Sequence, residues 1–142
     1  MTEDECIFCK IACHKIESRI VYEDEHAIGI LDAKPRFAKG QCVVFSKKHV
    51  AHVYDLEEGD ALWLFKGIKA VAKKMEKLYK LEHVAIFVRG RTISHAHAIL
   101  FPTFPVEEDM LSQFLKPMIL YNPLAQISEL ELDEIAAKLR SL

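Results

Sequence analysis

Residues 93–101 read ISHAHAILF, and this stretch is the most informative one in the 142-residue chain. An extended, largely apolar segment of this length predicts a β-strand. Because side chains alternate between the two faces of a strand, His95 and His97 are expected on the same face. Two imidazoles on one face are costly to bury unless they bind something, so the pair points to a metal, a phosphate or catalysis.

Cys6 and Cys9 form a second informative pair. In a reducing compartment, this spacing is more typical of metal or redox chemistry than of a structural disulfide. A redox pair is expected between a strand and a helix of a βαβ unit, and no strand is predicted before Cys6, so metal binding is favoured over redox chemistry or plain packing. A tetrahedral zinc site needs two more ligands. The candidates are His95 and either His49 or His52, and the spacing alone does not decide between the last two.

The composition is that of an ordinary globular protein. Hydrophobic residues make up 51% of the chain, which is enough for one core, and the length predicts a single domain over residues 1–142. The formal net charge of −2 gives no sign of a basic surface for nucleic acid. No apolar run reaches the ~18 residues of a membrane helix, and the acidic first residues do not resemble a signal peptide. We therefore expect a cytoplasmic protein with neither a nucleic-acid nor a membrane partner.

The hydrophobic pattern predicts an α+β fold. One long helix is expected over residues 58–80, and strands are expected over residues 19–23, 26–32, 41–46, 82–88 and 93–101. The helix has apolar residues at spacings of three and four, and its lysines are expected on a solvated face. The predicted core stripe is Leu62, Phe65, Ile68, Ala72, Met75 and Tyr79. A single helix between the third and fourth strands favours a mostly antiparallel sheet over an alternating βαβ fold.

At this point the sequence resembles the histidine triad (HIT) family of nucleotide hydrolases and transferases. The resemblance rests on five segments in family-like order: CIFCKI at 6–11, VYEDEH at 21–26, ILD at 30–32, KGQCVVFSKKHV at 39–50 and HAHAILFP at 95–102. It implies a five-stranded antiparallel sheet with two main helices, and usually a homodimer. Residues 103–142 carry little of it, and there we expect loops and a final helix that Ser128 caps.

The resemblance also implies a metal site and a catalytic residue. In family members with an amino-terminal Cys-x-x-Cys, four side chains hold zinc, and the matching positions in this sequence are Cys6, Cys9, His49 and His95. The middle histidine of the triad, His97, is implied as the nucleophile that attacks the α-phosphate of a nucleotide. A covalent nucleotidyl-histidine splits one hard displacement into two easier ones.

The nucleotide itself has two further implied contacts. Asp32 matches the acidic residue that accepts hydrogen bonds from the ribose hydroxyls. Thr92 lies three residues before the first triad histidine, where the family usually has a serine that touches the phosphate or the leaving group. A purine base is the family default, and the leaving group stays open.

The chain departs from the family pattern at two places. Ile99 occupies the third triad position, and isoleucine donates no hydrogen bond. The loss of one preorganised donor typically costs ~100- to 1,000-fold in rate. The connection before the triad lacks the asparagine and glutamine of the family but contains Arg89 and Arg91. Arginine pairs well with phosphate, so either arginine is a candidate replacement for the lost phosphate contacts, with a solvated turn as the alternative.

Two functions follow from these observations. The chain is either a working nucleotidyl hydrolase or transferase with a modified phosphate site, or a weakly active or inactive protein that binds a nucleotide or a protein partner. A structural zinc ion would be retained in both cases and does not discriminate between them.

Overall fold

The computed structural model describes residues 3–88 and 93–103, which fall within one compact unit, Met1–Pro105. The predicted helix capped by Ser128 and the rest of residues 104–142 lie outside the described part. The expectation of one domain over residues 1–142 therefore stays a prediction.

Five strands form one antiparallel sheet in the order β1-β2-β3-β5-β4. The strands are β1 (Ile20–Glu23), β2 (Ala27–Leu31), β3 (Cys42–Ser46), β4 (Val84–Val88) and β5 (His97–Pro102). All five predicted strands are confirmed, with ends shifted by a few residues. The largest shift is in β5, which begins at His97 and leaves His95 in a bend before it.

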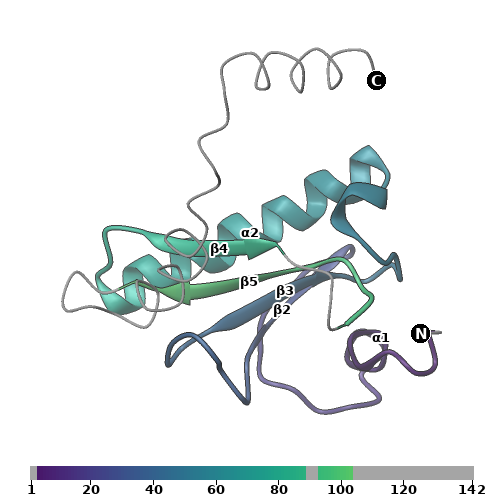
Figure 1. Ribbon diagram of the computed structural model, residues 1–142, viewed down its shortest axis with the longest axis horizontal. Coiled ribbons are helices and arrows are strands. Elements are labelled where there is room, and N and C mark those ends of the chain that lie inside the picture. The colour runs from purple at the N-terminus through teal and green to yellow at the C-terminus, as the bar shows by residue number, and fades with distance from the viewer. Residues whose placement is uncertain (1–2, 89–92, 104–142) are drawn as a thin grey trace, which may run out of the picture. The chain divides into compact units, whose positions relative to one another are not determined.

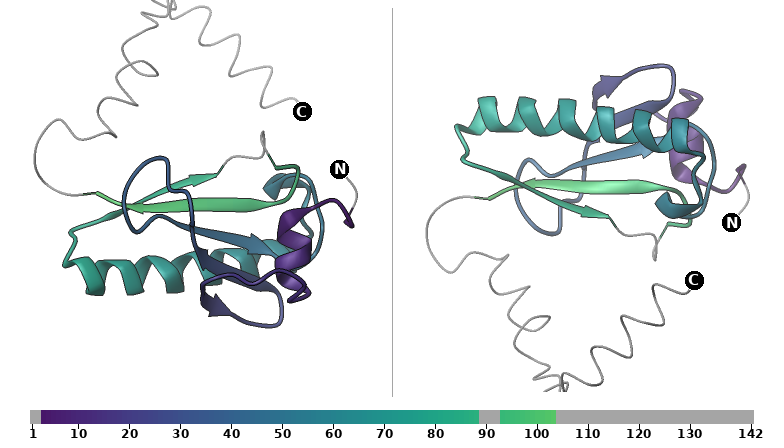
Figure 2. Two further views of the ribbon diagram at one scale, coloured as in Figure 1. Left: turned by 90° about the horizontal axis from the view of Figure 1, so that it is seen from below. Right: turned by 90° about the horizontal axis from the view of Figure 1, so that it is seen from above.

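The long helix α2 (Glu58–Tyr79) covers one face of this sheet (Figure 1; Figure 2). Its packing depends on close approach: a Cβ atom on Gly29 of β2 would lie only 2.8 Å from Cγ2 of Val71. Glycine at this position therefore lets the helix lie directly on the strand.

The predicted core stripe of α2 is partly wrong. Ile68 and Met75 are buried as expected, but Leu62 and Phe65 are 73% and 52% exposed. The buried face is Leu64, Gly67, Ile68, Val71 and Met75. Both stripes have helical spacing, and the sheet covers only one of them. The five lysines of α2 and Lys80, which follows it, are exposed as predicted: Lys66, Lys69, Lys73, Lys74, Lys77 and Lys80.

The short helix α1 (Ile7–Ala12) packs on the opposite face of the sheet (Figure 1). Phe8 of α1 stacks on Phe45 of β3, with ring centroids 4.4 Å apart. A single 3-10 turn, η1 (Val53–Asp55), which the sequence did not indicate, precedes α2. The fold is therefore the expected α+β arrangement of a five-stranded antiparallel sheet with two helices.

The β1–β2 turn is fixed by Asp24. Its Oδ1 accepts hydrogen bonds from the amides of His26 and Ala27, both at 2.8 Å, and the Tyr22 hydroxyl donates to its Oδ2 at 2.5 Å. Burial alone would raise the pKa of Asp24, but these three hydrogen bonds outweigh it and hold the pKa below its ordinary value.

Candidate functional site

Four predicted metal ligands come together where α1, the end of β3 and the start of β5 meet. The candidate ligand atoms of Cys6, Cys9, His49 and His95 all lie within 4.8 Å of one another. Nδ1 of His95 is 3.3 Å from Sγ of Cys6 and 3.2 Å from Nδ1 of His49. His49 is also 3.1 Å from Sγ of Cys9. The ring of His52, the other candidate, instead stacks on Tyr54.

The three shorter distances, 3.1–3.3 Å, are close to those between the ligand atoms of a tetrahedral metal ion. With metal–nitrogen bonds near 2.0 Å and metal–sulfur bonds near 2.3 Å, tetrahedral ligand atoms lie roughly 3.3–3.8 Å apart. Cys6 immediately precedes α1 and Cys9 lies in its first turn, so the helix places the two thiols on one side. Cys6 and His95 are completely buried. The four side chains are therefore positioned to bind a metal ion.

His95 is held in the protonation state that a metal requires. Its Nε2 lies 2.7 Å from the carbonyl oxygen of Ser46, and because a carbonyl only accepts, Nε2 carries the proton. The lone pair of Nδ1 is then directed at the cysteines. Burial lowers the pKa of His95 to about 4, so the imidazole stays neutral, as a metal ligand must be.

The Cys9 thiol needs a nearby cation to ionise. Burial, with a further contribution from Cys6, raises the pKa of Cys9 to about 12. A divalent ion held by the four side chains would supply the positive charge that favours the thiolate form of Cys9.

His97 lies two residues further along, on the same side of the sheet. The ring of Phe8 contacts both histidine rings, with centroids 5.5 Å from His95 and 5.2 Å from His97, so both imidazoles lie on the α1 side, although only His97 is part of β5. Nδ1 of His97 donates to the carbonyl oxygen of His95 at 2.5 Å, so Nε2 retains the lone pair. Burial lowers the pKa of His97, which keeps the ring neutral.

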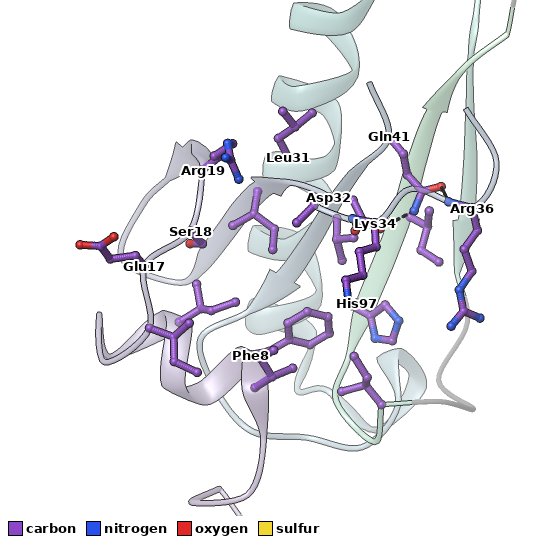
Figure 3. Close-up of a pocket in the computed structure, with 18 of the residues that line it drawn as sticks. Phe8, Glu17, Ser18, Arg19, Leu31, Asp32, Lys34, Arg36, Gln41 and His97 are labelled. Carbon is purple, nitrogen blue, oxygen red and sulfur yellow. Dashed lines mark hydrogen bonds between the residues drawn. The ribbon is translucent and has the colours of Figure 1, made fainter. Parts of the chain in front are cut away.

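A cavity of about 520 Å³ opens on this side of the sheet, and His97 lines it (Figure 3). The α1 side of the cavity is apolar and includes Ile7, Phe8 and Ile11. Asp32 lines the same cavity from the end of β2. A pocket of this size, apolar with a few convergent polar groups, is typical of small-molecule sites.

Asp32 is positioned by Gln41, a residue that the sequence analysis missed. Gln41 is 2% exposed, and its Nε2 donates to Oδ2 of Asp32 at 2.5 Å. Its Oε1 accepts from the amides of Arg36 and Phe37, at 3.3 and 3.1 Å. The other carboxylate oxygen of Asp32 accepts from the amide of Lys34 at 2.8 Å. Gln41 thus ties the carboxylate to the loop that follows β2.

Ile99 occupies the third triad position in the structure as in the sequence. It pairs with Val43 of β3 and Phe87 of β4, and its side chain lines the cavity two residues beyond His97. Arg89, Arg91 and Thr92 lie outside the described residues. The sequence analysis also missed the three cationic residues that line the cavity, Arg19, Lys34 and Arg36. The only signal of Lys34 and Arg36 was their place between Asp32 and Gly40.

Comparisons with known proteins agree with this architecture. Residues 5–98 match the family model described as "Scavenger mRNA decapping enzyme C-term binding". An uncharacterised HIT-like protein of Methanocaldococcus jannaschii is 27% identical over 139 residues, which cover 95% of this chain and 98% of that protein.

Solved structures give the same assignment. A HIT family protein from Bacillus anthracis superposes with a TM-score of 0.78 and 26% identity, covering 99% of this chain and 98% of that one. A hypothetical histidine triad nucleotide-binding protein from Sulfolobus tokodaii gives a TM-score of 0.65 and 29% identity, covering 72% of this chain and 71% of that one. The sheet, the cysteine–histidine cluster and the adjoining cavity define an α+β protein with four side chains positioned to bind a metal ion beside a cavity. By its fold and these matches, the chain belongs to the histidine triad family.

The absence of a membrane helix was also expected from the sequence. Among residues 3–88 and 93–103, no helix is both long enough and apolar enough to cross a membrane.

Proposed function

We propose that this protein is a nucleotide-binding hydrolase or transferase that acts at the α-phosphate through a nucleotidyl-histidine on His97. The observation that carries the proposal is the hydrogen bond from Nδ1 of His97 to the carbonyl of His95. It fixes the tautomer in which Nε2 is unprotonated, on a neutral ring that lines the cavity. A neutral imidazole is a good nucleophile and a tolerable leaving group near pH 7.

The reaction has two displacements. Nε2 of His97 forms a bond to the α-phosphorus while the bond to the leaving group breaks, and the leaving group takes the electron pair. Water, or a phosphate oxygen of an acceptor, then attacks the same phosphorus. The electron pair of the phosphorus–nitrogen bond returns to Nε2, and the proton of the attacking water passes to solvent.

Asp32 is proposed to bind the ribose. A carboxylate has about four acceptor positions, and the protein uses two of them, one for Gln41 and one for the amide of Lys34. The remaining two can accept hydrogen bonds from the two ribose hydroxyls. A purine base is proposed by family resemblance, with the apolar α1 side of the cavity as its place. Thr92, Arg89 and Arg91 are further proposed phosphate contacts.

Zinc is the proposed metal, since two thiolates and two imidazoles in a closed set are typical ligands of a structural zinc site. When bound, it would tie α1 to the chain at His49 and His95 and thereby brace the segment that enters β5. All four cysteines are free, which supports a cytoplasmic location, where thiols stay reduced.

A homodimer is proposed as well. Leu62 and Phe65 are apolar yet exposed on the outward side of α2, and Ile86 and Val88 of the edge strand β4 are 47% and 46% exposed. Exposed apolar groups of this kind are typical of association surfaces.

The second candidate function is a weakly active or inactive protein, stabilised by zinc, that binds a nucleotide or a protein partner. Ile99 favours it, because the third triad position offers no donor to the phosphate or the leaving group.

Intact mass spectrometry after acid-free quenching separates the two functions. We expect the wild type, mixed with an adenosine 5′-phosphoramidate or a diadenosine polyphosphate, to gain the mass of one adenylyl group. The adduct and the turnover should disappear in His97→Ala and persist in His83→Ala, which removes an exposed histidine outside the cavity. Monophosphate binding without any adduct or turnover would select the second function.

A further inference from the structure

Two cationic side chains lie beside the proposed nucleophile on the loop between β2 and β3. Lys34 and Arg36 both line the cavity that contains His97. In Figure 3, Lys34 extends toward the imidazole of His97, and Arg36 reaches down on the other side of the ring. Lys34 and Arg36 flank Pro35, and the loop directs both side chains into the cavity.

The backbone of this loop is held in place. The amide of Lys34 donates to Asp32 at 2.8 Å, and the amide of Arg36 donates to the buried side chain of Gln41 at 3.3 Å. Both cations are therefore fixed, through their backbones, relative to the carboxylate that is proposed to bind the ribose. A nucleotide whose ribose is bound by Asp32 would therefore place its phosphates near Lys34 and Arg36, two and four residues further along the chain.

Neither cation is neutralised by an acidic side chain. None of the ion pairs found in residues 3–88 and 93–103 includes Lys34 or Arg36. Two carboxylates line the cavity. Asp32 is engaged by Gln41, and Figure 3 shows Glu17 at the far side of the cavity from His97, with its carboxylate directed away from Lys34 and Arg36. Two uncompensated cations at the rim of a largely apolar cavity attract an anion, and arginine binds phosphate in two-pronged geometry.

The third triad position determines what kind of leaving group this arrangement can expel. Ile99 lines the cavity beside His97 and has no proton to give. An amine leaving group departs as a strong base and needs a general acid. A phosphate leaving group departs as a stable anion and needs only positive charge nearby. The site therefore has two cationic side chains near His97 and no donor at the third triad position.

We propose that Lys34 and Arg36 form a cationic subsite for the departing phosphate, so that the substrates are nucleotides whose α-phosphate is joined to another phosphate by an anhydride bond. The inference rests on the proposed function. Nε2 of His97 attacks the α-phosphorus, the bond to the bridging oxygen breaks, and that oxygen leaves with the electron pair as a phosphate anion next to the two cations. The nucleotidyl-histidine then yields a nucleoside monophosphate on attack by water.

A paired substrate comparison tests this subsite. Diadenosine triphosphate and adenosine 5′-phosphoramidate share the adenosine and the α-phosphate and differ only in the leaving group. We expect Lys34→Ala/Arg36→Ala to lower kcat/KM for the triphosphate by about tenfold to 100-fold, the usual effect of lost charge-assisted hydrogen bonds. For the phosphoramidate, kcat/KM should already be low in the wild type because Ile99 supplies no general acid, and the double substitution should change that low value by no more than about twofold. Lys39→Ala, a change of the same charge in the same loop but outside the cavity lining, should alter neither value. An equal loss on both substrates, or no loss on either, would overturn the proposal.

A binding measurement keeps the subsite testable if no substrate is turned over. Calorimetry with α,β-methylene-ADP and with AMP compares ligands that differ by one phosphate group. We expect the wild type to bind the methylene analogue more tightly, and Lys34→Ala/Arg36→Ala to lose that preference while it retains its affinity for AMP. Equal affinities in the wild type would refute the subsite. A preference without any His97 adduct would refute the proposed catalysis and leave the subsite standing.

Discussion

Replacement of Gln41 by methionine tests how the carboxylate that is proposed to bind the ribose is held. The side chain of Gln41 is 2% exposed and makes three hydrogen bonds, one to Asp32 and two from the amides of Arg36 and Phe37. Methionine has a similar length and volume but can form none of them with comparable strength. The change therefore removes polar partners and leaves the packing largely intact.

The magnitude follows from the three bonds. The bond to the carboxylate is charge-assisted and is worth about 1.5–3 kcal/mol, and each of the two amide bonds is worth about 0.5–1.5 kcal/mol. Partial hydration of the amides at the loop surface recovers some of this energy. We expect Gln41→Met to lower the free energy of unfolding by about 2–4 kcal/mol in urea denaturation, and to weaken nucleoside monophosphate binding.

A double-mutant cycle isolates the contact between Gln41 and Asp32. In an Asp32→Ala background, Gln41→Met should cost about 1.5–3 kcal/mol less than in the wild type, because the charge-assisted bond is already absent. Strict additivity of the two changes, or unaltered unfolding and monophosphate affinity in Gln41→Met alone, would refute the claim that Gln41 positions the carboxylate.

Three further predictions concern stability. Cys6→Ser should abolish the stabilisation by zinc, which is about 4 kcal/mol at a free metal concentration 1,000-fold above Kd and corresponds to roughly 10 °C or more in Tm. Cys13→Ser changes an exposed cysteine outside the cluster and should retain this stabilisation. Equal metal-dependent shifts of Tm in the two variants would contradict the assignment of Cys6 as a ligand. Asp24→Asn should lower stability by about 1–2 kcal/mol at pH 7. The folded-state pKa of Asp24 lies below its ordinary value of 3.8, so the stabilisation is fully present above pH 3.8 and is lost as the pH falls through the folded-state pKa. In urea denaturation, the free energies of unfolding of the wild type and Asp24→Asn should therefore converge only in acid. Leu64→Ala, at a completely buried position, should lower the free energy of unfolding by about 2–5 kcal/mol, whereas Leu78→Ala, at a position 71% exposed, should lower it by less than about 0.5 kcal/mol. Similar losses for both variants in urea denaturation would argue against the observed buried face of α2.

The core stripe of α2 shows where the hydrophobic pattern was ambiguous. Leu62 and Phe65 belong to one apolar series with helical spacing, Leu64 and Val71 belong to another, and Ile68 belongs to both. When a helix has apolar residues on two sides, its sequence does not determine which side the sheet covers. The buried side is decided by contacts with strands that are distant in the sequence. The presence of the helix was predictable because its period is local, but its orientation was not.

The metal cluster could also be predicted only in part, because some of its ligands are close in sequence and others are distant. The two cysteines are close in sequence and could be predicted as a pair. The choice between His49 and His52 required either the family resemblance or the fold, because the contact of Cys9 with His49 joins residues 40 positions apart. Gln41 and the loop cations were missed for a related reason. Gln41 lies in the segment 39–50 that carries the resemblance, but no role was implied for it, and Lys34 and Arg36 belong to none of the quoted segments; all three become important only where β2 and β3 place them near Asp32.

The two histidines of the opening stretch have different surroundings because β5 begins between them. A pair on a strand would place both rings at equivalent positions, and the sequence alone could not assign one to a metal and the other to catalysis. His95 precedes the strand, so its ring turns to the cysteines while its carbonyl oxygen accepts the proton of His97 Nδ1. His97 is the first residue of the strand, and its ring faces the cavity. The peptide of His95 therefore couples the two sites: the same residue that contributes to the cysteine–histidine cluster also sets the tautomer of the proposed nucleophile. This explains how a two-residue spacing serves both sites, and why the third position, Ile99, can change without disturbing either the cluster or the His97 tautomer.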